Sequence, residues 1–457
     1  MNPAAHRLDE WIARVDARQT HVGIIGLGYV GLPLALLFCE ERFRVTGFDI
    51  DQTKVDALNE GRSYIHRIEP MHIEAAQAAG FRATVNFAEL ADCDAVLICV
   101  PTPLHPDHTP DMSFVRGTIE AVAPHARAGQ LIVLESTTYP GTTEEVIVRA
   151  LEAGGAAGAR VLQNVNADSQ IAGSEDLNGI MVAFSPERED PGNQTTPRRA
   201  IPKVIGGVDS RAARAAAALY GAIFDRTVMV SSPAAAEMTK LLENIYRGVN
   251  IALANELKQL CMAMGIDIWE VIEAASTKPF GFQAFYPGPG IGGHCIPVDP
   301  FYLSWRARQF NQPTRFIELA GEVNEAMPAF VVQTVARLLE RQGKSLRGAS
   351  VLLLGIAYKR DVDDLRESPA LRIFDLLDRA GAEVAYNDPF FPEVGAGRHY
   401  AIQQKSTPLE RVGEFDCTLL ITDHSSYDCA SLVAASKLFV DTRNATRGIH
   451  SEKIVRC

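Results

Sequence analysis

The chain lacks the long apolar segments that would place it in a membrane or direct it out of the cell. None of its 457 residues falls in an apolar run of the roughly 20 residues that a spanning helix needs. The first twenty residues carry Asp9, Glu10 and Asp16 and have no apolar core, so they do not resemble a signal peptide. We therefore expect no membrane partner and a cytoplasmic location.

Paired cysteines are also missing. The eight cysteines include no Cys-x-x-Cys pair and no regular spacing, which predicts reduced thiols rather than a disulfide framework. The segment His105-Pro106-Asp107-His108 contains ligand-type side chains, but prolines flank it and no second ligand pair lies nearby. We interpret it as a polar loop and predict no metal.

Excess positive charge is the third absence. The net charge of −12 and the isoelectric point near 5.5 disfavour general binding of nucleic acid, and they require any anionic ligand to be held by local cations. The hydrophobic content of 47% and charged content of 22% are those of a soluble globular protein. The length predicts two or three domains.

A dinucleotide-binding pattern is present near the N-terminus. A short apolar strand at residues 21–25 leads into Gly26-Leu27-Gly28-Tyr29-Val30-Gly31 and then a helix over residues 32–41. Gly26 would permit the tight turn, Gly28 would let a pyrophosphate lie against the backbone, and Gly31 would let the helix pack closely on the sheet. The next strand, residues 44–48, ends in Asp49, which can bind ribose hydroxyls and would repel a 2′-phosphate. The pattern predicts NAD rather than NADP; the alternative is an ordinary strand-turn-helix unit.

Apolar strands and helices alternate along the rest of the chain. Strands are expected at 95–100, 131–134, 180–184 and 227–230, followed by helices at 233–265 and 314–341, the second with a possible kink at Pro328. A new α/β unit begins at 351–355, continues with a helix opened by Ser368-Pro369, and has strands at 383–386, 415–422 and 438–442. The predicted fold class is α/β, with two Rossmann-like, doubly wound parallel-sheet domains joined by a helical central region.

These elements divide the sequence into four segments. The divisions are an N-terminal helical extension at 1–20, an NAD-binding domain at 21–230, a central helical domain with a cysteine loop at 231–342, and a second Rossmann-like domain at 343–457. Trp11, Ile12 and Val15 would give the extension an amphipathic helix that docks on its neighbour. A Gly/Ala/Asn/Ser-rich stretch at 153–178 is interpreted as a loop insertion.

A lone cysteine, Cys295, follows a glycine-rich segment and precedes a predicted helix start. Asp299 is a good N-cap and Pro300 a good first helical residue. A thiol near a helix N-terminus is shifted toward the thiolate, which predicts a nucleophile. The alternative is a buried packing cysteine. That second interpretation is the one we give to Cys39, Cys93, Cys99, Cys261 and Cys417.

Two further segments carry groups suited to acid–base chemistry. Lys240 and Asn244 are one helical turn apart, where an ammonium and an amide could hold a developing oxyanion or a catalytic water; the alternative is an exposed Glu237–Lys240 pair. Glu187 follows a strand end, where ligands bind in parallel sheets, so it is either an acid–base group or part of a charged surface turn.

The second α/β unit has cations where the first has glycines. Lys359, Arg360 and Arg366 lie on the loop after its first strand and could form an anion pocket for the substrate. The alternative is a solvated loop in which neighbouring aspartates neutralise these cations. The aspartates are Asp361, Asp363 and Asp364.

Taken in order, these motifs resemble the UDP-glucose/GDP-mannose dehydrogenase superfamily over nearly the whole chain, and most of all its bacterial UDP-N-acetylglucosamine 6-dehydrogenases. The motifs are residues 26–31, Pro101-Thr102-Pro103, Glu135-Ser136-Thr137-Thr138, Phe184-Ser185-Pro186-Glu187-Arg188, and residues 237–244, 290–305, 358–361 and 367–369. Several motifs in the right order are far more specific than any one of them.

The resemblance implies an NAD-dependent, four-electron oxidation of the C6 alcohol of a UDP-sugar to the uronate, without release of the aldehyde. Cys295 would form a thiohemiacetal and then a thioester, which water hydrolyses. Lys240 and Asn244 would stabilise the C6 oxygen, and Lys240 with Asp299 would activate water. Glu187 and Thr137 would support the acid–base steps.

The resemblance also implies two sets of binding residues. For the cofactor they are Gly26, Gly28, Tyr29, Val30, Gly31, Asp49, Lys54, Thr102 and Thr137. For the substrate they are Glu187, Arg188, Lys240, Asn244, Phe285, Tyr286, Gly292, Lys359 and Arg366. A homo-oligomer and a product used in polysaccharide biosynthesis are further implications.

The segment at 277–283 resembles the N-acetylglucosamine branch of this family rather than the UDP-glucose branch, which implies UDP-N-acetylglucosamine as the substrate. Alternatives with the same chemistry are UDP-N-acetylmannosamine, UDP-N-acetylgalactosamine and UDP-glucose. A two-electron hydroxyacid or sugar-phosphate dehydrogenase would not need Cys295, and a non-catalytic NAD-binding sensor would bind the cofactor without turnover.

Overall fold

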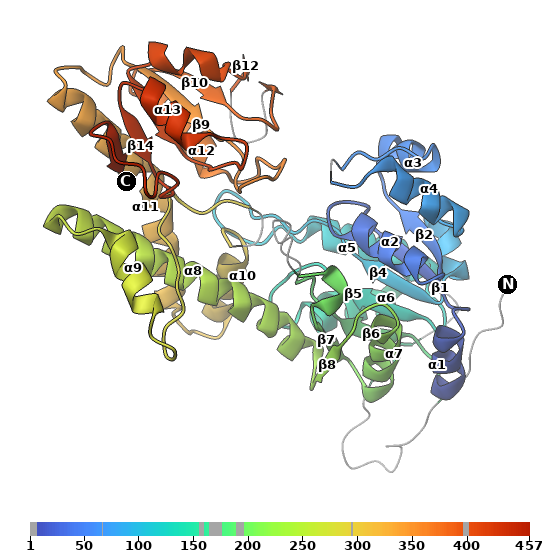
Figure 1. The fold of residues 1–457 in the computed structure, drawn as a ribbon. Coiled ribbons are helices and arrows are strands. Elements are labelled where there is room, and N and C mark those ends of the chain that lie inside the picture. The colour runs from blue at the N-terminus through green and yellow to red at the C-terminus, as the bar shows by residue number, and fades with distance from the viewer. Residues whose placement is uncertain are drawn as a thin grey trace. The chain divides into compact units, whose positions relative to one another are not determined.

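The computed structural model describes residues 7–65, 67–154, 160–163, 176–188, 196–293, 296–395 and 402–457. The chain forms two compact units, Met1–Glu243 and Asn244–Cys457 (Figure 1). Cys295 and most of the predicted insertion at 153–178 lie outside the described residues. The four-segment division made from the sequence stays a prediction.

The first unit is built on an eight-stranded sheet. In spatial order its strands are β3 (Arg82–Thr84), β2 (Arg44–Phe48), β1 (His21–Ile25), β4 (Ala95–Ile98), β5 (Leu131–Leu134), β6 (Met181–Phe184), β7 (Lys203–Gly207) and β8 (Thr227–Val230). Neighbouring strands are parallel except β6 and β7, which run antiparallel with Ala183 opposite Gly207. The parallel, doubly wound prediction is confirmed, whereas β3, β7 and the reversal were not predicted.

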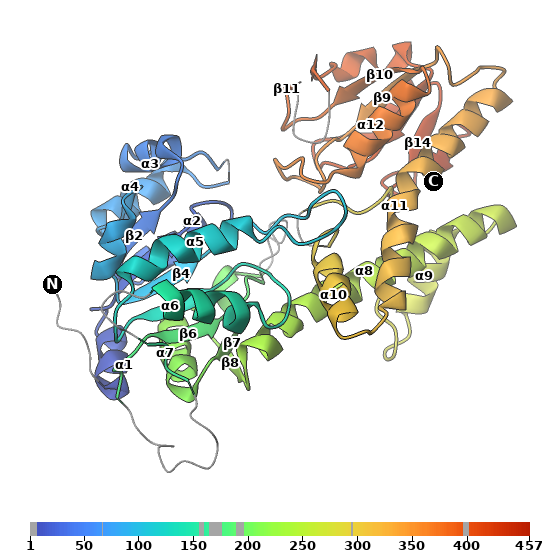
Figure 2. The same cartoon turned by 180° about the vertical axis from the view of Figure 1, so that it is seen from behind.

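Helices cover both faces of this sheet. One face carries α1 (Leu8–Asp16), α2 (Gly31–Glu40) and α7 (Ser210–Gly221), and the view from behind shows α5 (Ser113–Val122) and α6 (Arg149–Gly154) on the other (Figures 1 and 2). The connections also contain α3 (Gln52–Asn59), α4 (Pro70–Ala78), and the short helical segments η1 (Phe87–Asp92), η2 (Ala123–His125), η3 (Thr143–Val148) and η5 (Arg198–Ala200).

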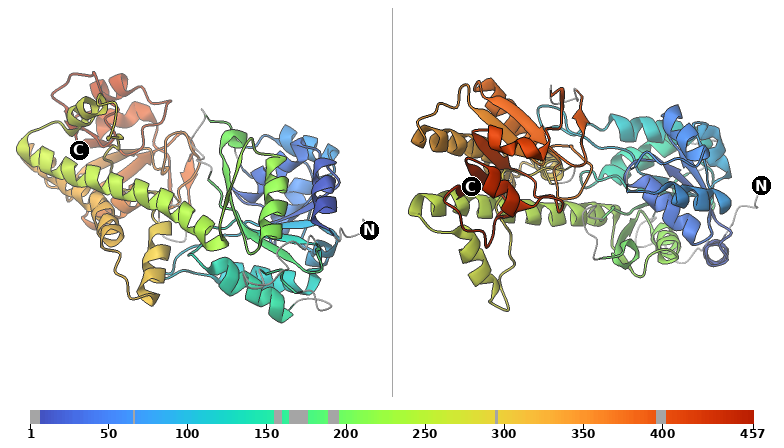
Figure 3. Two further views of the ribbon diagram at one scale, coloured as in Figure 1. Left: turned by 90° about the horizontal axis from the view of Figure 1, so that it is seen from below. Right: turned by 45° about the horizontal axis from the view of Figure 1, so that its top comes forward.

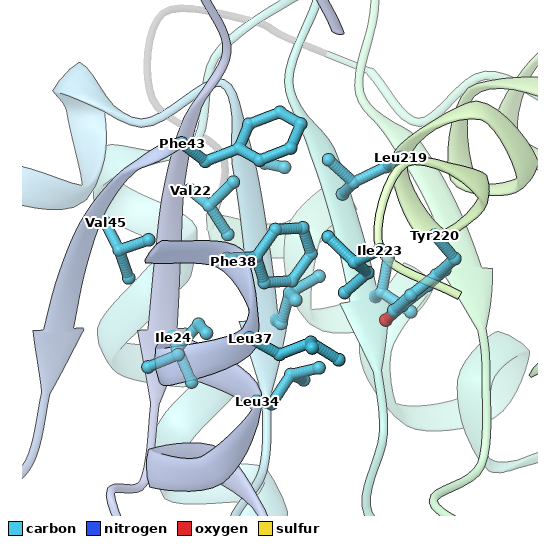
Figure 4. Close-up of a cluster of buried hydrophobic side chains, with 14 of the residues drawn as sticks. Val22, Ile24, Leu34, Leu37, Phe38, Phe43, Val45, Leu219, Tyr220 and Ile223 are labelled. Atoms are coloured by element: carbon cyan, nitrogen blue, oxygen red, sulfur yellow. The ribbon is translucent and has the colours of Figure 1, made fainter. Parts of the chain in front are cut away.

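The core of the first unit lies between α2, α7 and the sheet. Phe38 of α2 is fully buried beside Ile223, which follows α7, and Figure 4 shows side chains of the two segments facing one another. Burying a side chain of this size stabilises the fold by about 1.5–3 kcal/mol. Helix α1 adds Leu8, Trp11 and Val15 to the same core and packs against α7, so the predicted docking helix is confirmed.

Helix α8 (Pro233–Met264) is a single uninterrupted helix of 32 residues, which Figure 3 shows along much of its length. It ends where predicted, because Gly265 follows with a φ of +73°, a left-handed conformation that suits glycine at a helix C-terminus. The boundary between the two compact units falls within this helix, after Glu243.

The second unit contains α9 (Ile268–Ser276), α10 (Asp299–Gln309), α11 (Arg315–Arg341) and a five-stranded sheet. Its strands, in spatial order, are β10 (Glu383–Asn387), β9 (Ser350–Leu354), β13 (Cys417–Leu420), β14 (Phe439–Asp441) and β15 (Ile454–Arg456), and all are parallel. Core residues of α11 and α12 (Pro369–Arg379) pack on one face, and those of α13 (Cys429–Ala435) and η6 (Leu409–Glu414) on the other. A separate hairpin pairs β11 (Glu393–Val394) with β12 (Gln404–Lys405).

Helix α11 continues through Pro328, which is buried.

Within the part of the chain that the structure covers, no helix is both long enough and apolar enough to span a bilayer.

Candidate active site

The glycine turn between β1 and α2 has the geometry that its sequence predicts. Gly26 has a φ of +89°, and a Cβ on it would lie 2.5 Å from the carbonyl oxygen of Cys99. A Cβ on Gly31 would lie 1.9 Å from the carbonyl oxygen of Gly26, so α2 can begin this close to the turn only with glycine there. A Cβ on Gly28 would meet no atom within 4 Å. The open space at Gly28, next to the N-terminus of α2, suits a pyrophosphate.

Asp49 is held beside this turn. Its Oδ2 accepts a hydrogen bond from the backbone N–H of Leu27 at 2.9 Å, its Oδ1 accepts from the N–H of Asp51 at 3.0 Å, and the residue is buried. The Nζ of Lys54 lies 3.5 Å from Oδ2. Since each carboxylate oxygen accepts more than one hydrogen bond, both remain able to receive a ribose hydroxyl. The structure therefore brings residues 26–31, Asp49 and Lys54 together.

Thr102 and Thr137 follow the carboxyl ends of β4 and β5, which are neighbours in the sheet. The Oγ of Ser136 donates to the carbonyl oxygen of Val100 at 2.8 Å, which ties the two loops together. Thr102 is buried and Thr137 is half-buried. Both predicted cofactor contacts thus lie at the edge of the sheet where ligands of such folds bind.

Glu187 lies beyond the carboxyl end of β6 and is partly buried. Its Oε1 accepts from the backbone N–H of Arg188 at 2.7 Å, and its Oε2 lies 3.9 Å from the Nζ of Lys203. Burial would raise the pKa of Glu187, but Lys203, Arg198 and Lys240 outweigh that effect and lower the pKa. This environment does not fit the alternative of a solvated surface turn.

The Arg188 side chain is already engaged within the first unit. Its guanidinium makes two bonds to the carboxylate of Glu243, at 3.2 and 2.5 Å, and donates to the carbonyl oxygen of Pro202 at 2.6 Å. Its predicted role as a substrate contact stays a prediction.

Lys240 is buried on α8, and the alternative of an exposed Glu237–Lys240 pair is wrong. The Glu237 carboxylate is fully buried and accepts from the N–H of Gly141 at 2.6 Å, the N–H of Thr143 at 2.9 Å and the hydroxyl of Thr143 at 2.7 Å. It satisfies N–H groups at the start of the helical segment from Thr143 to Gly154. Burial, opposed by these hydrogen bonds, raises the pKa of Glu237 to about 7.

In the second unit, Asn244 and Asp299 form a buried pair. The amide Nδ2 of Asn244 donates to Oδ2 of Asp299 at 2.5 Å, and Nη2 of Arg247 donates to the amide oxygen at 3.0 Å. Val298, not Asp299, occupies the N-cap position of α10, and Asp299 is the first helical residue. The predicted cap is therefore wrong by one position, because the Asp299 carboxylate bonds the buried Asn244 amide instead.

The glycine segment before Cys295 packs against the loop that follows β9. The N–H of Gly293 donates to the carbonyl oxygen of Arg366 at 3.0 Å. A Cβ on Gly292 would lie 2.6 Å from the Cβ of Tyr358, so this approach requires glycine. The predicted substrate residue Gly292 and the loop of Lys359 and Arg366 are thus adjacent, although the cysteine itself lies outside the described residues.

The predicted anion loop is partly neutralised. The Nε and Nη2 of Arg366 bond the carboxylate of Asp364 at 2.9 and 2.7 Å. The Nε of Arg360 lies 3.6 Å from Oδ2 of Asp361, and its Nη1 bonds Asp423 at 3.0 Å. The alternative of aspartates pairing with the loop's cations therefore holds for these two arginines.

A pocket of about 160 Å³ nevertheless opens beside Lys359, at the carboxyl ends of β9, β13 and β14. Its lining residues are Tyr358, Lys359, Arg360, Thr422, Asp423 and Arg443. Sequence reasoning missed Arg443, whose Nε donates to the carbonyl oxygen of Ile421 at 2.9 Å. A cation directly after the predicted strand at 438–442 was the signal that could have found it.

The predicted substrate residues Phe285 and Tyr286 pack on the helices of the second unit. Phe285 meets Tyr246 of α8 edge to face, with ring centroids 5.6 Å apart, and Tyr286 stacks on Trp269 of α9 at 5.7 Å. Tyr286 is half exposed. Their roles toward a substrate stay predictions.

Three consecutive parts of the chain match domains of one known family. Residues 20–224 match the NAD binding domain of the UDP-glucose/GDP-mannose dehydrogenase family, residues 234–326 its central domain, and residues 352–448 its UDP binding domain. The UDP-N-acetyl-D-mannosamine dehydrogenase of Salmonella typhi is 39% identical over 79% of this chain and 83% of its own length. The chain belongs to the UDP-glucose/GDP-mannose dehydrogenase family.

Solved structures of this family share the fold. The UDP-D-ManNAc dehydrogenase from Pyrococcus horikoshii is similar with a TM-score of 0.81 and 32% identity, covering 95% of this chain and 97% of that one. The UDP-N-acetyl-mannosamine dehydrogenase from Staphylococcus aureus is similar with a TM-score of 0.76 and 30% identity, over 95% and 97%. A further relative, similar in sequence, is the NDP-N-acetyl-D-galactosaminuronic acid dehydrogenase of Ralstonia solanacearum. It is 34% identical over 92% of this chain and 95% of its own length.

Membership of this family makes the chain an NAD-dependent nucleotide-sugar dehydrogenase, and it confirms the predicted superfamily, fold class and cofactor. The residues present fit NAD, because Gly28 leaves the turn open and Asp49 is held ready to accept hydrogen bonds. When bound, NAD supplies the hydride acceptor for the oxidation.

Proposed function

We propose that this enzyme oxidises the C6 alcohol of a UDP-N-acetylhexosamine to the carboxylate, using two NAD for each sugar. The observation that supports this most directly is the buried Asn244–Asp299 pair, whose carboxylate opens α10 four residues after Cys295. The amide and the carboxylate are both buried away from bulk water and are bonded to one another. The amide is therefore suited to orienting an oxyanion, and the carboxylate to orienting a water molecule.

In the first half of the reaction, the C6 alcohol loses its hydride and gives its hydroxyl proton to the Glu187 carboxylate, while Lys240 and Asn244 stabilise the C6 oxygen. Asn244 commits one amide hydrogen to Asp299 and keeps a second for this oxygen. Arg247 and Asp299 fix the orientation of the amide, so the donor needs no reorganisation when charge develops.

In the second half, the Cys295 thiolate adds to the aldehyde carbon, and the resulting alkoxide takes up a proton to give a thiohemiacetal. Loss of a second hydride from the same carbon, and of the thiohemiacetal's hydroxyl proton to solvent, leaves a thioester. Water adds to the thioester carbonyl, the C–S bond breaks, and the carboxylate, one proton and the free thiol are released. Tethering the aldehyde makes the second oxidation unimolecular and prevents its escape.

The identity of the sugar rests on relatives and on one segment of the sequence. Relatives named UDP-N-acetyl-D-mannosamine dehydrogenase are 33–39% identical to this chain, which makes that sugar the first to test. The resemblance of the segment at 277–283 to the N-acetylglucosamine branch favours UDP-N-acetylglucosamine instead, and the name of the Ralstonia relative adds an N-acetylgalactosamine derivative. All three are N-acetylhexosamines.

The test is the amount of NADH formed for each UDP-sugar consumed, with the three N-acetylhexosamines and UDP-glucose assayed in parallel. Two NADH per sugar is the expected result, and relative kcat/KM values identify the substrate. One NADH per sugar would indicate a two-electron alcohol dehydrogenase. Binding of NAD without turnover on any of these sugars would indicate a sensor.

We also propose that the enzyme self-associates through an apolar stripe on α8, defined as Tyr246, Leu253, Leu257, Leu260 and Met264. These side chains are 38–62% exposed. Their spacing of three, four and seven residues is that of a helix that pairs with another helix, so the occupant we propose is the same stripe of a second copy.

Light scattering of the intact enzyme tests this association. We expect a homo-oligomer that dissociates when Leu257 and Leu260 are both changed to Glu. Met71→Glu, which places one such charge on an exposed apolar residue of α4, should leave the mass unchanged. A wild-type monomer, or a double variant with the wild-type mass, would refute the proposal.

A further inference from the structure

A buried lysine that the mechanism above does not use lies beside Glu187. Lys203 is the first residue of β7 and is almost fully buried. Its Nζ bonds Oε2 of Glu135 at 2.5 Å and the carbonyl oxygen of Pro186 at 3.1 Å, and it lies 3.9 Å from Oε2 of Glu187. One buried cation therefore serves two carboxylates.

The reversed strand explains why a cation stands at this place. Because β7 runs antiparallel to β6, it begins at the sheet edge where β5 and β6 end. Extending the register from Ala183 opposite Gly207 places Lys203 opposite Glu187. The reversal thus delivers the lysine to the edge that binds ligands in parallel sheets.

The rest of the network fixes the lysine rather than the substrate. The second oxygen of Glu135 accepts a hydrogen bond from the hydroxyl of Tyr220, whose ring lies among the core side chains in Figure 4. The Nζ of Lys203 also lies 5.1 Å from the centroid of that ring. Burial raises the pKa of Glu135, and the charge of Lys203 opposes this effect.

We propose that Lys203 is a positioning residue for catalysis: locked by Glu135 and Tyr220, it holds the Glu187 carboxylate in place and in its ionised form. The proposal rests on the proposed function, in which Glu187 supports the acid–base steps. An ionised Glu187 can accept a proton from water or from the C6 hydroxyl, whereas a protonated one cannot.

Other charged groups also act on Glu187, and they define what the lysine adds. Arg198 on η5 and Lys240 on α8 are cations that favour the carboxylate, and Glu135 after β5 opposes it. Of the cations, Lys203 acts most strongly on Glu187, ahead of Arg198 and Lys240. Removal of Lys203 should therefore raise the pKa of Glu187, although the cations Arg198 and Lys240 remain.

Four variants separate the role of the charge from the role of the fold. Lys203→Met alone leaves Glu135 buried without its cation and is expected to destabilise the protein. The decisive variant is therefore K203M/E135Q, which removes both charges of the buried pair. The matched control is E135Q, which breaks the same network but keeps the lysine, and Lys203→Arg keeps the charge with another shape.

The first readout does not depend on turnover. Infrared difference spectra of the holoenzyme follow protonation of Glu187, whose band is assigned by its loss in Glu187→Gln. We expect Glu187 to titrate at least about one pH unit higher in K203M/E135Q than in E135Q. Equal titration in the two variants would overturn the proposal.

The second readout is the pH profile of kcat with the preferred UDP-sugar. The acidic limb should move upward in K203M/E135Q by the same amount as the infrared titration, with KM for the sugar within about two-fold of wild type. Lys203→Arg should restore the wild-type limb. A shifted titration with an unmoved limb, or a full rate in Glu187→Gln, would also overturn the proposal.

The two levels of the proposal fail differently. If the wild-type enzyme turns over no UDP-sugar, the proposed function fails, and the infrared titration still decides whether Lys203 sets the charge of Glu187. If the enzyme is active and the titrations of the two variants coincide, the proposed function stands and the role given to Lys203 is wrong.

Discussion

Asp49 is the residue that we predict to set the preference for NAD over NADP. It is buried, it receives backbone N–H groups on both oxygens, and it stands beside the open Gly28 turn. A 2′-phosphate would bring further negative charge against this carboxylate, whose Oδ2 lies 3.5 Å from the Nζ of Lys54.

Changing Asp49 to Ala should weaken NAD binding by about 5- to 50-fold, because hydrogen bonds to a charged acceptor are lost. The preference for NAD over NADP should shrink at the same time. Titration calorimetry with both dinucleotides measures the effect. Asp51→Ala, the same charge change two residues further on, serves as the control, and identical affinities in D49A and wild type would contradict the role.

Cys295 carries the prediction that distinguishes a four-electron enzyme from a two-electron one. Cys295→Ala should lower formation of the acid by at least about 1,000-fold, since no thioester can form, while NAD affinity stays within about two-fold. Acid production is followed by chromatography of the UDP-sugar products. Cys429→Ala, at a half-buried cysteine of α13, should retain activity. A C295A variant that makes acid at the normal rate would rule out the covalent route.

At the scale of the elements, Glu237 links α8 to the start of the helical segment at Thr143 within the first unit. Its pKa of about 7 in the folded state exceeds the ordinary value of 4.5, so the native state holds this proton more tightly than the unfolded chain does. The contribution to stability is therefore complete below about pH 4.5 and is lost as the pH rises through 7.

Between pH 5 and 8, the free energy of unfolding should fall less in the Glu237→Gln variant than in wild type. The difference between the two falls should be on the order of 1–3 kcal/mol. It should also be less stable overall, because its amide NH2 group faces an N–H donor. Denaturant unfolding across this pH range gives the slope. Glu120→Gln removes a charge from an exposed position of α5 and should keep the wild-type slope. A slope in E237Q as steep as that of wild type would contradict the role given to Glu237.

Sequence patterns predicted the regular elements well where one signal dominated. The strands at 44–48, 131–134 and 227–230 are observed over those residues, because apolar runs of this length between turns have no competing structure. Strand β7 was missed because Lys203-Val204-Ile205-Gly206-Gly207 opens with a charge and ends with two glycines. Its antiparallel direction depends on a tertiary pairing that no local pattern encodes.

The candidate site shows the same division. The roles of Gly26 and Gly31 could be predicted because they follow from backbone sterics within one turn. The Asp299 carboxylate could not be placed, because its partner Asn244 lies 55 residues away in the chain. Lys203 and Arg443 were missed for a similar reason, since each acts through groups brought together by the sheets.

At the scale of the whole molecule, the chain is acidic overall but buries several of its lysines. The net charge is −12, yet Lys203, Lys240 and Lys258 are all buried. We predict that an anionic sugar nucleotide is recognised by a few local cations, such as those that line the Lys359 pocket, rather than by the overall field.

The uninterrupted course of α8 has a consequence for how the protein could be divided. The boundary between the compact units falls inside this helix, so any cut there would sever a continuous ladder of backbone hydrogen bonds. Each half expressed separately would carry a truncated part of α8, whose new end would lack its backbone hydrogen-bond partners and would expose apolar side chains. Gene fission, or exchange of halves between relatives, is thus disfavoured at the sequence boundary between the two compact units. We expect the two units to be inherited together as one gene.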